Sequence, residues 1–183
     1  MSARVEPRFT EGVDLVTSVD GDGAADRVSA HLMRRGYRLI KLLLRDDAHR
    51  VATLRLQPPV PEGVDVVAAE LPILDCIFAT CGIEPEIVAE ATETEVLTGV
   101  RVKTASIAHL VVMKLLSECP ERDKDRRDLR HLLKLARPHD LRDVERLIRL
   151  VKTRGFSRGK DLRAVLQRFV GESSGNALEE PTG

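Results

Sequence analysis

Two aspartates lie inside short apolar runs, where a charged side chain needs an explanation. Asp14 lies in Gly-Val-Asp-Leu-Val (residues 12–16) and Asp65 in Gly-Val-Asp-Val-Val (residues 63–67). The branched side chains around them predict β-strands. A carboxylate among Val and Leu is costly to desolvate unless it binds a cation or hydrogen-bond donors. We therefore expect the two aspartates to meet on adjacent strands, although Asp65 could also cap the turn after Gly63.

A second charged group lies in the C-terminal half of the chain. Lys114 falls on the apolar face of a helix that Thr104 or Ser106 can cap, and a lysine there either extends to the rim or meets an anion. Asp125 and Asp128 are three residues apart on the next predicted helix and can share a face. Alternatively, they are first-turn acids that stabilise the start of that helix.

Hydrophobic periodicity and turn residues predict an α+β fold. A mixed β-sheet core over residues 1–103 is followed by a helical region over 104–170 and a disordered tail over 171–183. The segment Leu71–Ala91 is ambiguous and favours short helices broken at Gly82 and Pro85. Elsewhere we expect strands at residues 12–16, 37–45, 50–57, 63–68, 95–97 and 100–102. We expect helices at residues 24–35, 106–115, 124–136, 141–154 and 161–170.

Composition indicates a globular protein with an uneven charge distribution. The 183 residues are 43% hydrophobic, and no apolar run approaches the roughly 20 residues that span a bilayer. Without a signal-peptide core either, we expect no membrane partner and a cytoplasmic location. The three cysteines lack Cys-x-x-Cys spacing, which favours reduced packing residues. Residues 1–119 carry 13 Lys/Arg and 18 Asp/Glu (−5), and residues 120–170 carry 16 and 8 (+8). That basic region could attract a polyanion, or its helices could simply have solvated faces.

Two motifs resemble those of a known enzyme family. Arg8-Phe9-Thr10-Glu11-Gly12-Val13-Asp14-Leu15-Val16 resembles the Arg-x-Thr turn and Asp-x-Asp strand of the minimal and AbiEii-like nucleotidyltransferases, which include abortive-infection, toxin-type proteins. Residues 106–115 with 124–129 are similar to the family pattern Leu-x-x-x-Lys-Leu … Lys-Asp-x-x-Asp-Leu. The resemblance covers about residues 8–135. It implies a nucleotidyltransferase-like mixed-sheet core, a nucleoside triphosphate substrate and Mg²⁺.

The resemblance also implies roles for individual residues. Asp14 and Asp65 would hold Mg²⁺, with Asp65 as the carboxylate from a later strand, and Lys114 would contact the triphosphate. The implied substrate-binding residues are Arg8, Thr10, Asp125 and Asp128.

Two parts of the family pattern are absent. Gly12 stands where the first aspartate would be, and Glu11 is one residue off, on the opposite face of a regular strand. Only seven residues precede Arg8, so we expect the Gly-Gly or Gly-Ser segment that usually comes first to be missing or to lie upstream.

Three functions follow from these observations. The first is an active nucleotidyltransferase that moves a nucleoside monophosphate to RNA or to a protein hydroxyl. The second is a degenerate member of the fold that binds nucleotide, RNA or protein without turnover. The third is a helical DNA-binding or interaction module. Toxin-like relatives would also imply a cognate antitoxin as partner.

Overall fold

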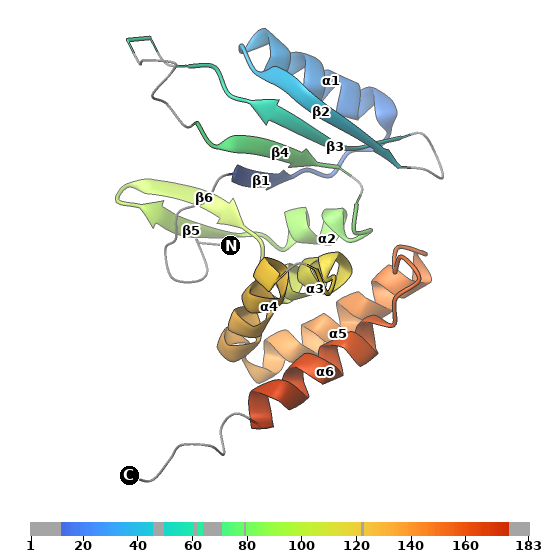
Figure 1. The fold of residues 1–183 in the computed structure, drawn as a ribbon. Helices are drawn as coiled ribbons and strands as arrows, with labels where there is room; N and C mark the ends of the chain where they lie inside the picture. Colours follow the sequence, from blue (N-terminus) through green and yellow to red (C-terminus); the bar gives the residue numbers. More distant parts are fainter. Residues whose placement is uncertain are drawn as a thin grey trace. The chain divides into compact units, whose positions relative to one another are not determined.

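The computed structural model describes residues 12–45, 50–60, 62–63, 71–78, 80–121 and 123–175. The fold is α+β, as predicted: a mixed four-stranded sheet, a two-stranded sheet, and helices concentrated in the C-terminal half (Figure 1). The chain divides into two compact units. We call Arg8–Thr80 with Glu84–Val88 the sheet unit; the remainder, Met1–Pro7, Cys81–Ile83 and Ala89–Gly183, is the helical unit.

In the described residues, the sheet unit contains helix α1, most of a second helix near its end, and four strands that pair in the order β1-β4-β3-β2. Strand β1 pairs parallel with β4, whereas the β3–β4 and β2–β3 pairs are antiparallel. The first and last strands of this sheet, in the order of the described chain, are therefore neighbours. The elements are β1 (Gly12–Val16), α1 (Asp22–Arg34), β2 (Arg38–Arg45), β3 (Arg50–Gln57) and β4 (Ile73–Ile77).

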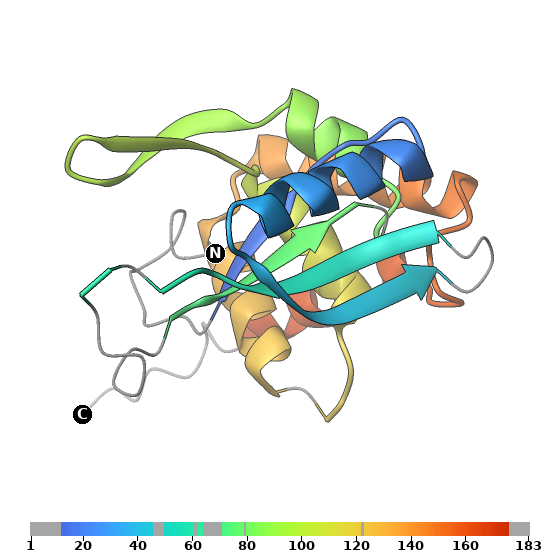
Figure 2. The ribbon, with the colours of Figure 1, turned by 90° about the horizontal axis from the view of Figure 1, so that it is seen from above.

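One face of this sheet packs against α1, which lies along it in Figure 2. Leu54 and Leu56 of β3 and Cys76 of β4 are buried in the core that α1 covers. Side chains alternate between the two faces of a strand. Arg55 and Asp75, which lie beside these core residues in sequence, therefore point to the face opposite α1.

The prediction of short helices over Leu71–Ala91 is wrong in its first half. Residues 73–77 form β4, and a helix, α2 (Glu84–Ala89), follows. The run Ile-Leu-Asp-Cys-Ile is a strand because it forms ladders with strands on both sides, β1 and β3. Pro85 does not break α2, since it occupies the second helical position, where no intrahelical N–H bond is lost.

The helical unit contains a β-hairpin and four helices. The hairpin is longer than the one predicted at residues 95–97 and 100–102. It belongs to the same compact unit as the helices that follow it, whereas the sequence placed it before a boundary at residue 103. The last helix continues to Gly175, five residues into the segment expected to be disordered; residues 176–183 lie outside the described residues. The elements are β5 (Thr92–Leu97), β6 (Val100–Thr104), α3 (Ile107–Ser117), α4 (Asp123–Leu135), α5 (Pro138–Thr153) and α6 (Leu162–Gly175).

The helices of this unit share one apolar core. Each buried aliphatic side chain contributes about 1.5–3 kcal/mol of transfer free energy. The core side chains that are completely buried come from all four helices: Val111, Val112, Leu115, Leu129, Leu132, Val144, Leu147, Val151 and Phe169.

Among the described residues, no helix has the combination of length and apolar character that crossing a bilayer requires.

Candidate functional site

Asp14 and Asp75 occupy matching positions on two neighbouring strands. In the parallel β1–β4 ladder, Asp14 is the register partner of Asp75. Register partners point to the same face of a sheet, and adjacent strands lie about 4.8 Å apart. Two carboxylates are therefore held side by side on the face opposite α1. Like charges at this spacing repel each other, so the pair favours a nearby cation.

Arg55 on β3 supplies one such cation. Its Nε donates to Oδ1 of Asp75 at 2.9 Å and its Nη2 donates to Oδ2 at 2.7 Å. Both oxygens of Asp75 therefore accept from one guanidinium, the bidentate geometry that arginine forms best. The Arg55 side chain is 52% exposed and that of Asp75 is 18% exposed.

The electrostatics of this face follow from these contacts. The hydrogen bonds to Asp75 raise the pKa of Arg55, the charge of Asp75 raises it further, and the charge of Asp14 adds a smaller contribution. Burial, assisted by the Asp75 charge, raises the pKa of the Cys76 thiol to about 11. Cys76 is thus a protonated packing residue, in line with its predicted role.

A fourth charged residue extends the row across the sheet. Lys41 on β2 is the register partner of Arg55, which in turn is the partner of Asp75. The order of strands β1-β4-β3-β2 therefore carries Asp, Asp, Arg and Lys on one face. One edge of this face attracts cations and the other attracts anions, an arrangement suited to a metal-bound phosphate group.

Gly12 lies on the same face as Asp14, two residues away on β1. A Cβ at this position would stand 3.0 Å from the carbonyl oxygen of Ile73, the register partner of Gly12. The close approach of the two backbones leaves little room for a side chain at this position.

The two carboxylates fit a divalent cation that arrives with its ligand. Among the described residues, no three or more His, Cys, Asp or Glu side chains converge as a metal-ligand set. Mg²⁺ is nevertheless commonly bound by one or two carboxylates together with substrate phosphates and waters. Asp14 and Asp75 could supply that protein share, provided that Asp75 is shared with or released by Arg55.

In the helical unit, Lys114 of α3 joins the two aspartates of α4 in a cluster of ion pairs. Its Nζ donates to Oδ1 of Asp125 at 2.5 Å and lies 3.0 Å from Oδ2 of Asp128. Burial alone would lower the pKa of Lys114, but the hydrogen bonds and charges of both carboxylates outweigh it, and the net pKa is raised. Of the two expectations for Lys114, contact with an anion is observed, and the anions are the carboxylates of Asp125 and Asp128. These contacts tie α3 to α4, and the implied contact of Lys114 with a triphosphate stays a prediction.

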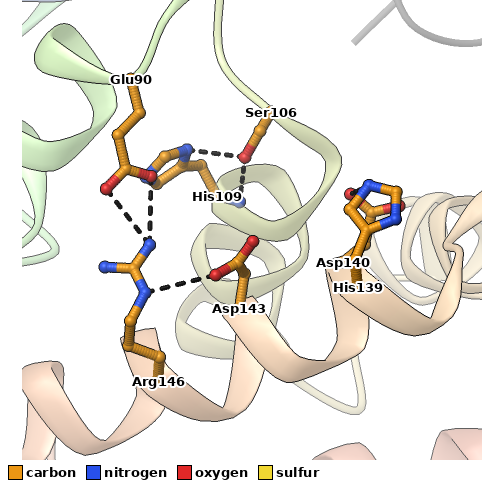
Figure 3. A network of polar contacts seen from close by, with 7 residues as sticks. All are labelled: Glu90, Ser106, His109, His139, Asp140, Asp143 and Arg146. Atoms are coloured by element: carbon orange, nitrogen blue, oxygen red, sulfur yellow. Dashed lines mark hydrogen bonds and ion pairs between the residues drawn. The ribbon is translucent and has the colours of Figure 1, made fainter.

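A second polar network fixes the start of α3 (Figure 3). Ser106 caps the helix: its Oγ accepts from the backbone N–H of His109 at 3.3 Å and lies 2.8 Å from His109 Nδ1. His109 is fully buried, and its Nε2 lies 3.6 Å from Glu90. Arg146 of α5 donates to both oxygens of Glu90 at 3.1 Å and to Asp143 at 3.3 Å. This network positions α3, the helix that carries Lys114.

Several predicted site residues lie outside the part of the chain that the structure describes. These are Arg8, Thr10 and Asp65, so their roles stay predictions. Asp14 and Lys114 belong to different units, and the idea that they share one site likewise stays a prediction.

Sequence reasoning missed Asp75 and Arg55. The signal for Asp75 was present, since Ile-Leu-Asp-Cys-Ile repeats the lone aspartate in an apolar run that drew attention to Asp14. The helical interpretation of this segment concealed it. Arg55 carries no such signal, because an arginine on a strand becomes informative only when the register shows which carboxylate it meets.

Comparison of the chain with known protein families and with curated proteins identifies no relative. No protein-family model matches the chain, and no curated protein matches it. The case for any function therefore depends on the residues and their geometry.

Proposed function

We propose that the chain is a nucleotidyltransferase-like protein that binds a Mg²⁺-bound nucleoside triphosphate on the Asp14–Asp75 face of the sheet. The observation that carries this proposal is the parallel register of these two aspartates on neighbouring strands. Asp75 then takes the role of the carboxylate from a later strand, which the resemblance had suggested for Asp65. Arg55 and Lys41, next in the same row, supply positive charge for phosphate oxygens.

The reaction would be transfer of a nucleoside monophosphate. An acceptor hydroxyl on RNA or on a protein attacks the α-phosphorus, the bond to the β-phosphate oxygen breaks, and pyrophosphate leaves with the electron pair. The hydroxyl proton passes to a carboxylate of the pair or to water. Mg²⁺, when bound, neutralises phosphate charge as that charge develops, which supplies much of the catalysis in phosphoryl transfer. Asp14 and Asp75 would hold the metal ion and, through it, orient the phosphates.

A transfer assay tests this function. Purified full-length protein is incubated with each α-labelled nucleoside triphosphate, Mg²⁺ and bulk RNA, and label in RNA and in protein is measured. We expect transfer by the wild type and a large loss with Asp14→Asn and with Asp75→Asn, which keep side-chain size but remove charge. Transfer that is unaffected by both substitutions would refute the proposed site.

A second candidate is the same fold binding nucleotide without turnover. Two observations favour it: Gly12 provides no carboxylate, and both oxygens of Asp75 are engaged by Arg55. This candidate predicts nucleotide binding that depends on Asp14 and Asp75 with no label transfer. The same proteins and nucleotides, measured by equilibrium binding in place of transfer, separate the two candidates.

The proposal places the protein in the cytoplasm, where nucleoside triphosphates and reducing conditions occur together. Cys76, Cys81 and Cys119 are all free thiols, which agrees with such a compartment. A toxin-type role would add a cognate antitoxin as partner, and co-expression with the product of the neighbouring gene tests it.

A further inference from the structure

Strand β2 forms one edge of the four-stranded sheet, on the side away from β1 (Figure 1). Within the described part of the chain, its ladder partner is β3, on one side only. An edge strand directs part of its backbone N–H and C=O groups away from its neighbour, where they can pair with another strand. The free side of β2 is therefore a place where the sheet can be extended.

The side chains of β2 are largely apolar and accessible to solvent. Five of its eight residues are large aliphatic residues with 40% to 48% of their surface exposed: Leu39, Ile40, Leu42, Leu43 and Leu44. Contiguous exposed apolar surface of this kind marks interaction sites, and on an edge strand it favours association with a further strand.

The second half of β2 has the regular geometry that a further strand requires. The register of β2 with β3 has two irregularities, and neither interrupts β2 between Lys41 and Arg45. The first inserts an extra residue of β2 before Lys41, and the second inserts one in β3. Successive side chains therefore alternate between the two faces. Leu42 and Leu44 lie on the α1 face, because Leu42 is the register partner of the core residue Leu54.

The charge of β2 is entirely positive. Its sequence, Arg-Leu-Ile-Lys-Leu-Leu-Leu-Arg, contains three basic residues and no acidic one. Lys41 is the register partner of Arg55, and like charges directly opposite each other destabilise a strand pair. Asp75 offsets the charge of Arg55 on its other side. The equivalent position beside Lys41 is the free edge of β2, where a carboxylate on an added strand would be a direct cross-strand neighbour.

We propose that the free edge of β2 binds an extended segment of a partner protein in which acidic and aliphatic residues alternate. The aliphatic residues continue the α1 face beside Leu42 and Leu44, and the acidic residues lie beside Lys41 on the opposite face. In strand addition, backbone hydrogen bonds supply affinity and alternate side chains supply specificity. Such binding requires neither nucleotide nor Mg²⁺, so this inference does not rest on the proposed function.

Two other occupants fit this edge less well. A second copy that paired through its own β2 would bring three more positive charges and no carboxylate to the edge. Lysine on an edge strand opposes self-association in this way. A nucleic acid offers neither a peptide backbone for the ladder nor aliphatic side chains for the leucines. Lys41 therefore selects acidic strands against basic ones.

Peptide binding to the full-length protein, measured by fluorescence anisotropy without nucleotide or Mg²⁺, tests the proposal. The probes are labelled peptides as long as β2, in which Val alternates with Glu, with Gln or with Lys. A fourth peptide replaces the central Val of the Glu–Val peptide by Pro, which removes a backbone donor. We expect the affinity to fall in the order Glu–Val, Gln–Val, Lys–Val, and the proline peptide to bind least among the acidic probes.

Reversal of the charge of Lys41 should reverse this preference. Lys41→Glu should bind the Glu–Val peptide about fivefold more weakly than the wild type does, and the Lys–Val peptide more tightly. The fold should tolerate this change, because Lys41 is exposed and the change removes a like charge opposite Arg55. Lys124→Glu makes the same charge change at an exposed position in the first turn of α4, and it should leave both affinities unchanged.

The apolar contribution is tested separately. Leu42→Thr/Leu44→Thr keeps side chains that favour strands and removes apolar surface from the edge, so binding of the Glu–Val peptide should weaken on the order of tenfold. Leu97→Thr, at a β5 side chain that is 70% exposed, is the control and should have no effect.

Several results would overturn the proposal. These are no binding of the Glu–Val peptide by the wild type, equal affinities for the Glu–Val and Lys–Val peptides, undiminished binding of the proline peptide, or an unchanged preference in Lys41→Glu. The comparison of peptides on the wild type holds whether or not a variant folds. A wild-type dimer in analytical ultracentrifugation that Leu42→Thr/Leu44→Thr abolishes would make a second copy the occupant and would also overturn the proposal.

Discussion

Removal of Arg55 should strengthen divalent-cation binding at the Asp14–Asp75 face. In the structure, both oxygens of Asp75 accept from the Arg55 guanidinium, so a cation must share or displace it. Arg55→Gln removes this competitor and also removes a positive charge beside the cation. We therefore expect the substitution to act in the opposite direction from Asp75→Asn, which removes the ligand itself.

The size of the effect follows from the exposure of the pair. With 52% of Arg55 and 18% of Asp75 accessible to solvent, the ion pair belongs near the upper end of the range for exposed pairs, about 1 kcal/mol. Since RT is about 0.6 kcal/mol, releasing Asp75 should tighten cation binding about fivefold. Lys41→Gln, with the same charge change one strand further from Asp75, should have a smaller effect.

Mn²⁺ titrations followed by electron paramagnetic resonance, with and without a non-hydrolysable nucleoside triphosphate, measure these affinities. Weaker binding of Mn²⁺ without nucleotide in Arg55→Gln would mean that Arg55 holds Asp75 in place for the metal and would refute the competition argument. An equal increase in Mn²⁺ affinity from Lys41→Gln would show that the effect comes from the loss of one positive charge on this face and not from release of Asp75. Absence of any binding that depends on Asp14 or Asp75, in every variant, would instead refute the proposed function.

Three further predictions concern single positions. Gly12→Asp should tighten Mn²⁺ binding relative to Gly12→Asn, and equal Mn²⁺ affinities of the two variants would contradict this prediction. Both substitutions should lower the free energy of unfolding by about 1 kcal/mol, because a Cβ at position 12 lies 3.0 Å from a β4 carbonyl oxygen. Lys114→Met should lower the free energy of unfolding by about 3 kcal/mol in a denaturant titration, since it removes the Lys114 cation from the buried Asp128 and the part-buried Asp125. Because the folded pKa of Lys114 is raised, its contribution is complete below the ordinary value of 10.5 and is lost as pH rises through the folded pKa, so the difference between wild type and Lys114→Met should shrink above about pH 10.5. Gly82→Ala should lower the free energy of unfolding by about 1–3 kcal/mol more than Gly159→Ala does. Both glycines have φ near +70°, but of the two only Gly82 would place its new Cβ against an aromatic ring, 2.5 Å from Cγ of Phe156. Equal losses of unfolding free energy in the two variants would contradict this prediction and show that the Phe156 ring moves aside without a measurable free-energy cost.

Local patterns were sufficient for the parts of the structure that short-range rules determine. The β2–β3 hairpin and the helices from α3 onward follow from alternation, helical spacing and turn residues. Helical spacing also put Asp125 and Asp128 on one face and Lys114 on an apolar stripe, but that these three residues meet follows from the packing of α3 against α4, which no local rule gives.

The partners of Asp14 could not be derived in the same way. Its neighbour Asp75 is set by a parallel pairing between distant strands, and no local rule fixes which strand pairs with which or in what register. The segment 71–91 was also misleading, because a five-residue apolar run is compatible with a strand or with part of a buried helix. The role of Arg55 depends on that pairing in turn.

The parallel pairing of β1 with β4 has a consequence for how the candidate site is assembled. Asp14 and Asp75 are separated by 61 positions along the chain, the difference between their numbers, and come from the first and last strands of the sheet unit. Contacts between such distant positions form late, because closing the intervening loop costs entropy before the pairing compensates for it. A nascent chain therefore acquires both carboxylates only after β4 has been synthesised and has inserted between β1 and β3. Cation binding that requires both would then report completion of this sheet, and a partly folded chain would lack it.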